Sequence, residues 1–246
     1  MVKRNVKTEV RIALLIVVGM APASILSQTP SVVPASDKSD WWSTTASQSE
    51  ENIEPVLHRE ISDKNYQIAG INLHDMELTT VYEKIGEAHS VQRGDASTWR
   101  EQACYISRSS ERRPVYLVFE HGEVNTSFYL FNEATPWNGS SSCTQTEKVS
   151  VATATASGLR LGMTPKQVIG VLGQPSVRKQ NELVYAVEVK KKTPPDALAR
   201  ARQQHPELTE EQFREDYATY DLTVLIRARF SRTKLVYLGV SITETS

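Results

Sequence analysis

The chain has 246 residues, a formal net charge of −1 and 39% hydrophobic residues. A length of this order is typical of about one or two domains, and the composition is that of a globular protein with a buried core. Because neither basic nor acidic residues are in excess, the charge does not indicate a nucleic-acid-binding protein or a solvated acidic tail.

The N-terminus, residues 1–23, has the pattern of a secretory signal peptide. Basic residues such as Arg4 and Arg11 precede an apolar run at residues 12–20, and a small-residue site surrounds Ala23. The pattern predicts cleavage near Ala23 and a periplasmic or secreted protein. The run is shorter than the roughly 20 residues that span a bilayer, so we expect no stable membrane span after cleavage. The alternative is an uncleaved N-terminus that acts as an anchor.

Residues 24–64 are rich in Ser, Thr, Pro and Glu and contain few periodic apolar positions. Such a composition buries too little surface to offset the entropy of ordering, so we predict a disordered linker. Trp41 and Trp42 are unusual in this setting. Two interpretations stay open: the pair is a docking motif, or it packs loosely on the folded part.

An internal repeat follows the linker. The stretch that begins at Gly70 aligns with the stretch that begins at Gly158, with one residue inserted. The coincident positions are Gly70/Gly158, Leu73/Leu161, Met76/Met163, Val81/Val168, Ile85/Leu172 and Gly86/Gly173. In the second copy Thr164 and Gln167 form a capping box, and Gly173 is suited to end the helix. The pattern predicts one short helix in each copy.

Three strand-like runs follow each copy of the helical motif. They are residues 99–107, 115–120 and 124–131 in the first copy, and 183–189, 222–230 and 235–243 in the second. Their alternation and short turns indicate antiparallel hairpins. We therefore predict an α+β fold, a tandem repeat of a short helical segment packed on an antiparallel three- to four-stranded sheet. The predicted repeats are residues 65–148 and 153–246.

The second repeat carries a predicted helical insertion at residues 194–220. Residues 196–204 have a helical composition, and Thr209 with Gln212 forms a second capping box after the break at Pro206. The insertion is interpreted either as a solvated excursion or as an element that contributes to specificity, because long insertions between strands often carry function.

Alternation within the strands assigns residues to two sheet faces. One face carries Phe119 and Phe230 and must pack against the helices. The same alternation places Val124 and Val236 on this face and Leu235 on the opposite face. We predict that the opposite face is exposed and binds a protein. The candidate binding residues are Tyr116, Val118, Tyr129, Phe131, Leu225, Arg227, Arg229 and Tyr237. Aromatic residues and Arg are typical of interface hot spots. The alternative is that the repeats, or the Trp41–Trp42 segment, cover this face.

Two cysteines remain after the signal peptide, Cys104 and Cys143. In an oxidising compartment a lone pair is expected to form a disulfide. The alternative is a Cys104 thiol activated by His121, which no local motif supports. No phosphate-binding loop, Gly-x-Ser-x-Gly or His-Glu-x-x-His motif is present, and the five histidines are scattered. We therefore predict no catalytic residues, no metal and no cofactor.

The motif of residues 158–175, Gly-Leu-Arg-Leu-Gly-Met-Thr-Pro-Lys-Gln-Val-Ile-Gly-Val-Leu-Gly-Gln-Pro, resembles the SmpA/BamE-like family. The layout of two such modules is also similar to that of the β-lactamase inhibitory proteins. The resemblance covers roughly residues 66–246. In the first copy Leu78 and Ala88 stand where the motif has prolines. The resemblance implies a helix-on-sheet fold used twice and proteins that bind other proteins without chemistry. It identifies no partner and transfers no binding residue.

These features together predict an exported, non-enzymatic protein-binding module that acts in the periplasm or outside the cell. Its partner is unidentified, and an inhibitor-like action is one option. The alternative is an envelope-associated scaffold or outer-membrane assembly accessory that is tethered by an uncleaved N-terminus.

Overall fold

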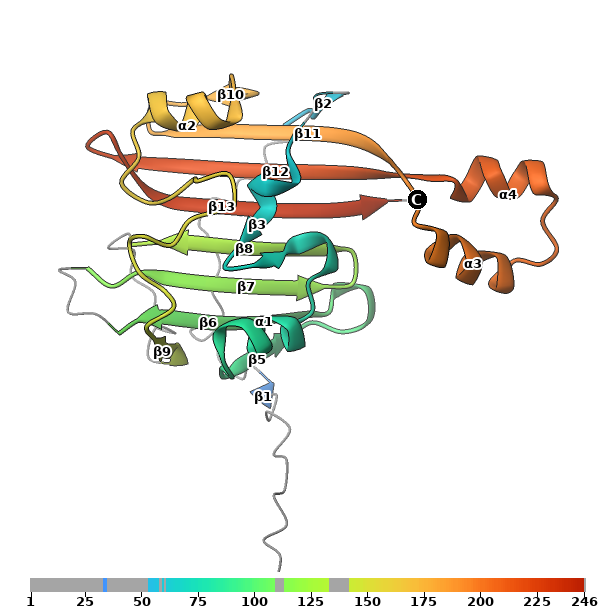
Figure 1. Cartoon of the computed structure of the whole chain (residues 1–246), viewed down its shortest axis with the longest axis horizontal. Coiled ribbons are helices and arrows are strands. Elements are labelled where there is room, and N and C mark those ends of the chain that lie inside the picture. Colours follow the sequence, from blue (N-terminus) through green and yellow to red (C-terminus); the bar gives the residue numbers. More distant parts are fainter. Residues whose placement is uncertain are drawn as a thin grey trace, which may run out of the picture.

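The protein is an α+β molecule built on one large sheet, as seen in the computed structural model (Figure 1). The structure describes residues 33–34, 53–57, 59, 61–108, 113–132 and 142–245. Within these residues the strand order is β1-β5-β6-β7-β8-β13-β12-β11-β10, with β2 paired to β11 and β9 paired to β6. No helix in this part of the chain combines the length and apolar character needed to cross a membrane.

The first half of the chain supplies one side of the sheet. Its main elements are α1 (Leu78–Ile85), β5 (Ser90–Arg93), β6 (Arg100–Ser107), β7 (Tyr116–Gly122) and β8 (Asn125–Phe131). The shorter strands β1 (Val33–Pro34) and β9 (Thr144–Thr146) pair with β5 and β6, whereas β2 (Val56–Leu57) pairs with β11 of the second half. Strands β3 (Gln67–Ile68) and β4 (Ile71–Asn72) form a separate two-stranded sheet. Single 3-10 turns occupy Asp63–Tyr66, Leu73–Asp75 and Ala96–Thr98.

The second half supplies the other side with elements in the same order. They are α2 (Pro165–Leu172), β10 (Val177–Arg178), β11 (Glu182–Lys192), α3 (Pro195–Gln204), α4 (Glu210–Tyr217), β12 (Thr219–Ser231) and β13 (Lys234–Thr245). The capping boxes predicted at Thr164 and Thr209 are confirmed, each with a glutamine three residues on. α3 and α4 project beyond the end of the sheet (Figure 1).

The two halves meet through their last strands. β8 and β13 pair antiparallel over seven residues, from Tyr237 opposite Phe131 to Thr243 opposite Asn125. The α+β class is confirmed, but two separate three- to four-stranded sheets are not observed. Because β8 and β13 each had an open edge, they pair with each other and leave no edge strands in the middle of the molecule.

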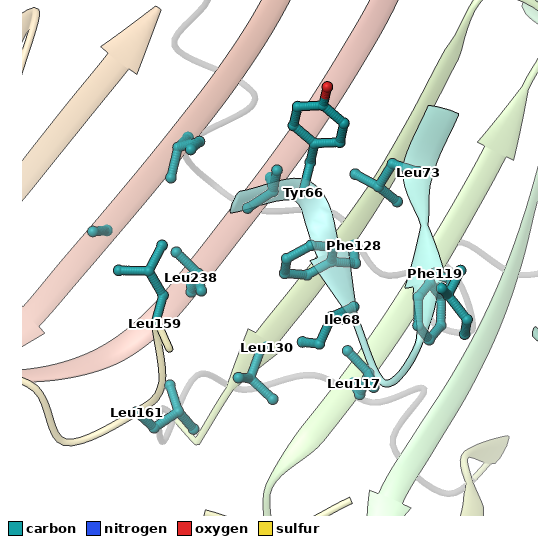
Figure 2. Packing of buried hydrophobic residues seen from close by; sticks show 14 of the residues in the cluster. Tyr66, Ile68, Leu73, Leu117, Phe119, Phe128, Leu130, Leu159, Leu161 and Leu238 are labelled. Carbon is teal, nitrogen blue, oxygen red and sulfur yellow. The ribbon is translucent and has the colours of Figure 1, made fainter. Parts of the chain in front are cut away.

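The core lies between the sheet and the segments that cross its helix-bearing face. Figure 2 shows Ile68 of β3 lying over Leu117 and Phe119 of β7 and over Phe128 of β8. Val81 of α1 and Val168 of α2 are fully buried in the same cluster. One continuous core thus runs under both halves, and each helix contributes apolar residues to it.

The predicted face assignment holds along most of the strands and fails at two places. A bulge between Arg229 and Phe230 shifts the register of β12 against β13, so Leu235 enters the core and Val236 becomes half-buried. An extra residue in one strand reverses the alternation beyond it, and a strict period of two cannot anticipate this. Val124 is 57% exposed because it lies in the turn before β8 and not within the strand.

Part of the stretch at residues 24–64 contacts the second half of the chain. Residues of β2 pair with Val187 and Glu188 of β11, and the Arg59 guanidinium donates a hydrogen bond to the Leu172 carbonyl at 2.8 Å. These contacts order the end of the stretch at residues 24–64. The predicted signal peptide and the Trp41–Trp42 pair lie outside the described residues.

A buried tyrosine connects each helix end to the sheet. The Tyr105 hydroxyl of β6 donates to the Gly86 carbonyl at 2.6 Å, and the Tyr185 hydroxyl of β11 donates to the Gly173 carbonyl at 3.2 Å. Both glycines have positive φ angles, 118° and 77°, which favour glycine at the end of a helix. Burial raises the pKa of both tyrosines, so the hydroxyls stay protonated donors.

We expect Tyr105→Phe to lower the free energy of unfolding by about 1 kcal/mol, because the Gly86 carbonyl loses its donor in a buried place. Tyr185→Phe should have a smaller effect, since its hydrogen bond is longer. Tyr217→Phe, a change in the inserted α4, is the control. Urea unfolding at neutral pH measures all three, and equal stabilities of Tyr105→Phe and Tyr217→Phe would contradict the expectation.

Candidate functional site

The eight residues predicted to bind a protein are neighbours on one face of the sheet, across the junction of the two halves. In one row Tyr116 lies opposite Phe131, Phe131 opposite Tyr237, and Tyr237 opposite Arg229. In the next row Val118 lies opposite Tyr129, and Arg227 follows across Gly239. Leu225 lies in the row beyond, opposite Ser241. We call these eight residues the outer surface; it lies on the side away from α1 and α2.

The aromatic rings of the outer surface contact one another from strand to strand. The Tyr116 and Phe131 rings stack with centroids 5.0 Å apart, Phe131 lies 6.4 Å from Tyr237, and Tyr129 lies 6.5 Å from Tyr237. Val118, Phe131 and Tyr237 are the centre of this cluster, and Cys104 packs against it. Cross-strand aromatic pairs of this kind stabilise neighbouring strands, so the cluster also holds β8 to β13.

The centre of the outer surface is buried, which corrects the prediction that the whole face is exposed. Val118, Phe131 and Tyr237 are 0%, 2% and 1% exposed, whereas the other five residues are half-buried. Strand alternation shows which residues share a face but not what lies over that face. A role in binding stays a prediction, and the accessible part of the surface is the set of half-buried residues around the centre.

Two arginines give the outer surface its charge. The Arg229 guanidinium carbon lies 3.9 Å from the centre of the Tyr237 ring, a cation–π contact. Arg227 lies 3.6 Å from Glu182 of β11, and both side chains are largely buried. Both guanidinium groups are therefore held in place by β11 and β13, and their positions are fixed before any partner arrives.

Glu120 is a buried carboxyl at the edge of the outer surface. Its Oε2 accepts a hydrogen bond from Gln102 at 2.6 Å, and its Oε1 lies 3.3 Å from Arg100. Desolvation by burial raises the pKa of Glu120 despite these partners. Sequence analysis missed Glu120 and Gly239, although the alternation that selected Val118 and Tyr237 also places these two on the same face.

The predicted disulfide between Cys104 and Cys143 is confirmed. It joins two cysteines that are 39 positions apart in the sequence. The disulfide thereby links the chain after β8 to strand β6, beside the aromatic cluster. A free Cys104 thiol activated by His121 is therefore not present; the His121 ring instead contacts the edge of Trp99.

A second polar cluster joins the first half to the C-terminal strand. His74 Nδ1 lies 2.6 Å from a Glu244 carboxylate oxygen, and the His74 ring stacks on Tyr220 with centroids 5.9 Å apart. These residues, with Asp75 and Arg200, line a cavity of about 530 Å³ beside α3. No sequence spacing links His74 to Glu244, so this cluster could not be anticipated. Among the described residues no three His, Cys, Asp or Glu side chains gather as a metal site requires.

Comparison with known proteins identifies no relative. No protein-family model matches the chain, no curated protein matches it, and no solved structure matches it. The resemblance of residues 158–175 to the SmpA/BamE-like family therefore stays a sequence-based prediction.

We expect Gly239→Ala to destabilise the protein by about 1–3 kcal/mol, the usual cost of overpacking. An added Cβ would lie within 3.1 Å of two Tyr237 ring carbons and closer still to the hydroxyl oxygen, and this ring is buried between its neighbours. Gly170→Ala on α2, where no atom lies within 4 Å, is the control and should be neutral or stabilising. Thermal unfolding distinguishes them; equal melting temperatures would refute the tight packing.

We expect the pH dependence of stability to change in Glu120→Gln. A carboxyl whose pKa is raised by folding binds its proton more tightly in the native state, so the free energy of unfolding falls as pH rises from the unfolded pKa to the folded pKa. Glutamine does not titrate and keeps an acceptor for Gln102. The stability of wild type relative to Glu120→Gln should therefore decrease as pH rises above about 4.3. Urea unfolding across pH checks this, with Glu123→Gln as the exposed control; a constant difference would refute it.

Proposed function

We propose that this chain is an exported, non-enzymatic protein-binding module that acts in the periplasm or outside the cell. The observation that carries the proposal is the row formed by Tyr116, Phe131, Tyr237 and Arg229 across four neighbouring strands. Aromatic residues and arginine are enriched at protein interfaces relative to the rest of the protein surface.

The accessible contacts in this proposal are made by the half-buried residues. Tyr116, Tyr129, Arg227 and Arg229 surround the buried centre and come from both halves of the chain. Ordered side chains lose less conformational entropy on binding than free ones do, so a surface held by stacking and by the Glu182–Arg227 ion pair is preorganised.

We also infer that the two halves are tandem repeats, with a first repeat at residues 65–148 and a second at 153–246. Apart from the α3–α4 insertion, each half runs helix, short strand and three long strands, and the order of these strands is mirrored about the β8–β13 junction. The hydrogen bonds of Tyr105 and Tyr185 to the helix-ending glycines support the equivalence, because they recur at corresponding places. A duplicated module explains why the outer surface draws equally on both halves.

Export is supported by the signal-peptide pattern of residues 1–23 and by the Cys104–Cys143 disulfide, since disulfides persist mainly in oxidising compartments. Mass spectrometry of the purified native protein tests this proposal. A mature N-terminus near residue 24 supports a released module, whereas an intact N-terminus with membrane co-sedimentation supports the tethered scaffold.

The binding surface is tested by placing a photo-cross-linking amino acid at Tyr116 in the natural host and identifying the adduct by mass spectrometry. The purified partner then binds wild type and a Tyr116→Ser/Arg229→Ser variant. We expect at least about a tenfold loss of affinity, the effect of removing a hot-spot residue.

Val124→Ser/Val151→Ser is the matched control, because both valines are exposed and lie away from the outer surface. Circular dichroism confirms that each variant is folded. Unchanged affinity of the folded Tyr116→Ser/Arg229→Ser variant, or cross-linking from Val124 but not from Tyr116, would overturn the assignment of this face.

A further inference from the structure

A groove of about 540 Å³ lies on the helix-bearing side of β11, on the other side of the sheet from the outer surface. Its floor is formed by alternate residues of β11, Tyr185, Val187, Val189 and Lys191. One wall is the C-terminal end of α2, with Val171 and Leu172, and the other is formed by Arg59, Ile61, Ser62 and Asn65. The groove exists because the eight residues of α2 cover only part of the eleven-residue strand below them.

The apolar character of this site extends beyond the groove. Val56, Leu57 and Val171 are 42%, 58% and 37% exposed, three of the few large apolar side chains that the described chain presents to solvent. β2, which carries Val56 and Leu57, pairs with β11 beside Val187, and α2 lies over the same strand (Figure 1). Apolar residues gathered around a groove mark a binding site more often than scattered ones do.

A positive charge lies at one end of the groove. Arg59 spans its α2 end, with its guanidinium carbon 5.7 Å from the centre of the Tyr185 ring, and donates to the Leu172 carbonyl. Burial raises the pKa of Tyr185 to about 12, and the positive charges of Arg59 and Arg178 oppose that rise, so both guanidinium groups act on this end of the groove. Among the described residues that line the groove none is acidic; at the far end Lys191 is paired with Asp63.

A polar group without a partner also lies in the groove wall. Asn65 is 5% exposed, and its side-chain oxygen makes no hydrogen bond to the described residues. This oxygen is itself buried, so its missing donor is a cost of the fold at this wall and not a contact that the groove offers to a ligand.

We propose that this groove binds the C-terminal residue of a partner polypeptide, with its α-carboxylate at Arg59 and an apolar side chain against Leu172, Tyr185 and Val187. Two features of the groove match two parts of such a chain end: the Arg59 guanidinium matches the carboxylate, and the apolar floor matches the side chain. Arginine recognises carboxylates with paired hydrogen bonds, which suits this role. The site is separate from the outer surface and extends the function proposed above.

The probe is N-acetyl-leucine, which carries the carboxylate and the apolar side chain of such a chain end in one small molecule. We expect saturable shifts of the backbone amide resonances of residues 59–65, 171–173 and 185–191, with a dissociation constant on the order of 1 mM for a probe of this size. N-acetyl-leucinamide, which lacks the carboxylate, should bind at least about fivefold more weakly, because it forfeits the charged contact.

Two variants test the site from different sides. Arg59→Gln removes the carboxylate partner, and Val171→Glu places a negative charge on an exposed wall position that a folded chain tolerates. Each should weaken N-acetyl-leucine binding at least about fivefold. Val151→Glu, at a similarly exposed valine outside the groove, is the matched control and should leave binding unchanged. Tyr116→Ser/Arg229→Ser should also leave it unchanged, which separates this site from the outer surface.

The proposal is overturned if N-acetyl-leucine gives no saturable shifts, if the shifts map outside the groove, or if N-acetyl-leucinamide binds equally well. Saturation by decanoate without saturation by N-acetyl-leucine would assign the groove to a lipid chain instead of a polypeptide end. Equal loss of binding in Val171→Glu and Val151→Glu would show a general charge effect and would also refute the site.

Discussion

The antiparallel pairing of β8 with β13 is the interaction on which the rest of the structure depends. It converts two sets of strands into one sheet and fixes the register in which Phe131 faces Tyr237 and Ser127 faces Ser241. The Ser127 hydroxyl donates to the Ser241 hydroxyl at 2.8 Å across this junction, on the outer side, while Leu130 and Leu238 face the core. A slip of one residue would exchange the two sets of side chains, burying hydroxyls in the core and placing leucines among the rings of the outer surface. Because both the core and the aromatic cluster need the same register, they reinforce each other.

Local signals made the elements of the second half predictable from the sequence. Thr164, Pro165 and Gly173 each act within one helical turn, so the bounds of α2 follow from them without reference to the rest of the chain. The same holds for α4, which Thr209 and Gln212 begin. The eight residues of the outer surface were also found correctly as a group sharing one face, because strand alternation is a local property.

What the sequence could not show is how these elements meet at long range. Strands β5 and β10 are too short to display alternation, and the joining of β8 to β13 depends on two open edges that no local pattern records. The bulge at Arg229 made the predicted faces of Leu235 and Val236 wrong, because alternation predicts the face of a residue only where the register of the strand is unbroken. Burial of Phe131 and Tyr237 was missed for a related reason: a period of two identifies a face, whereas exposure depends on every other segment of the chain. The groove on β11 was missed entirely, since Arg59 belongs to a stretch whose composition predicts disorder.

The contacts that tie the segment before β3 to the second half bear on the binding function proposed above. Lys191 of β11 pairs with Asp63, which accepts a hydrogen bond from Tyr66, and farther along the chain His74 binds Glu244 of β13. The Lys191–Asp63 and His74–Glu244 contacts each join residues more than 120 positions apart in the sequence, whereas the Tyr66 hydrogen bond is local. Because these links lie on the helix-bearing side and the aromatic cluster lies on the other, the β8–β13 junction is held from both faces. Opening the sheet like a hinge would break both sets of contacts together, so the two halves are expected to present their surfaces as one preformed unit. Recognition by this protein would then depend on the shape and charge that the folded chain already has, and substitutions at the junction should reduce stability before they alter specificity.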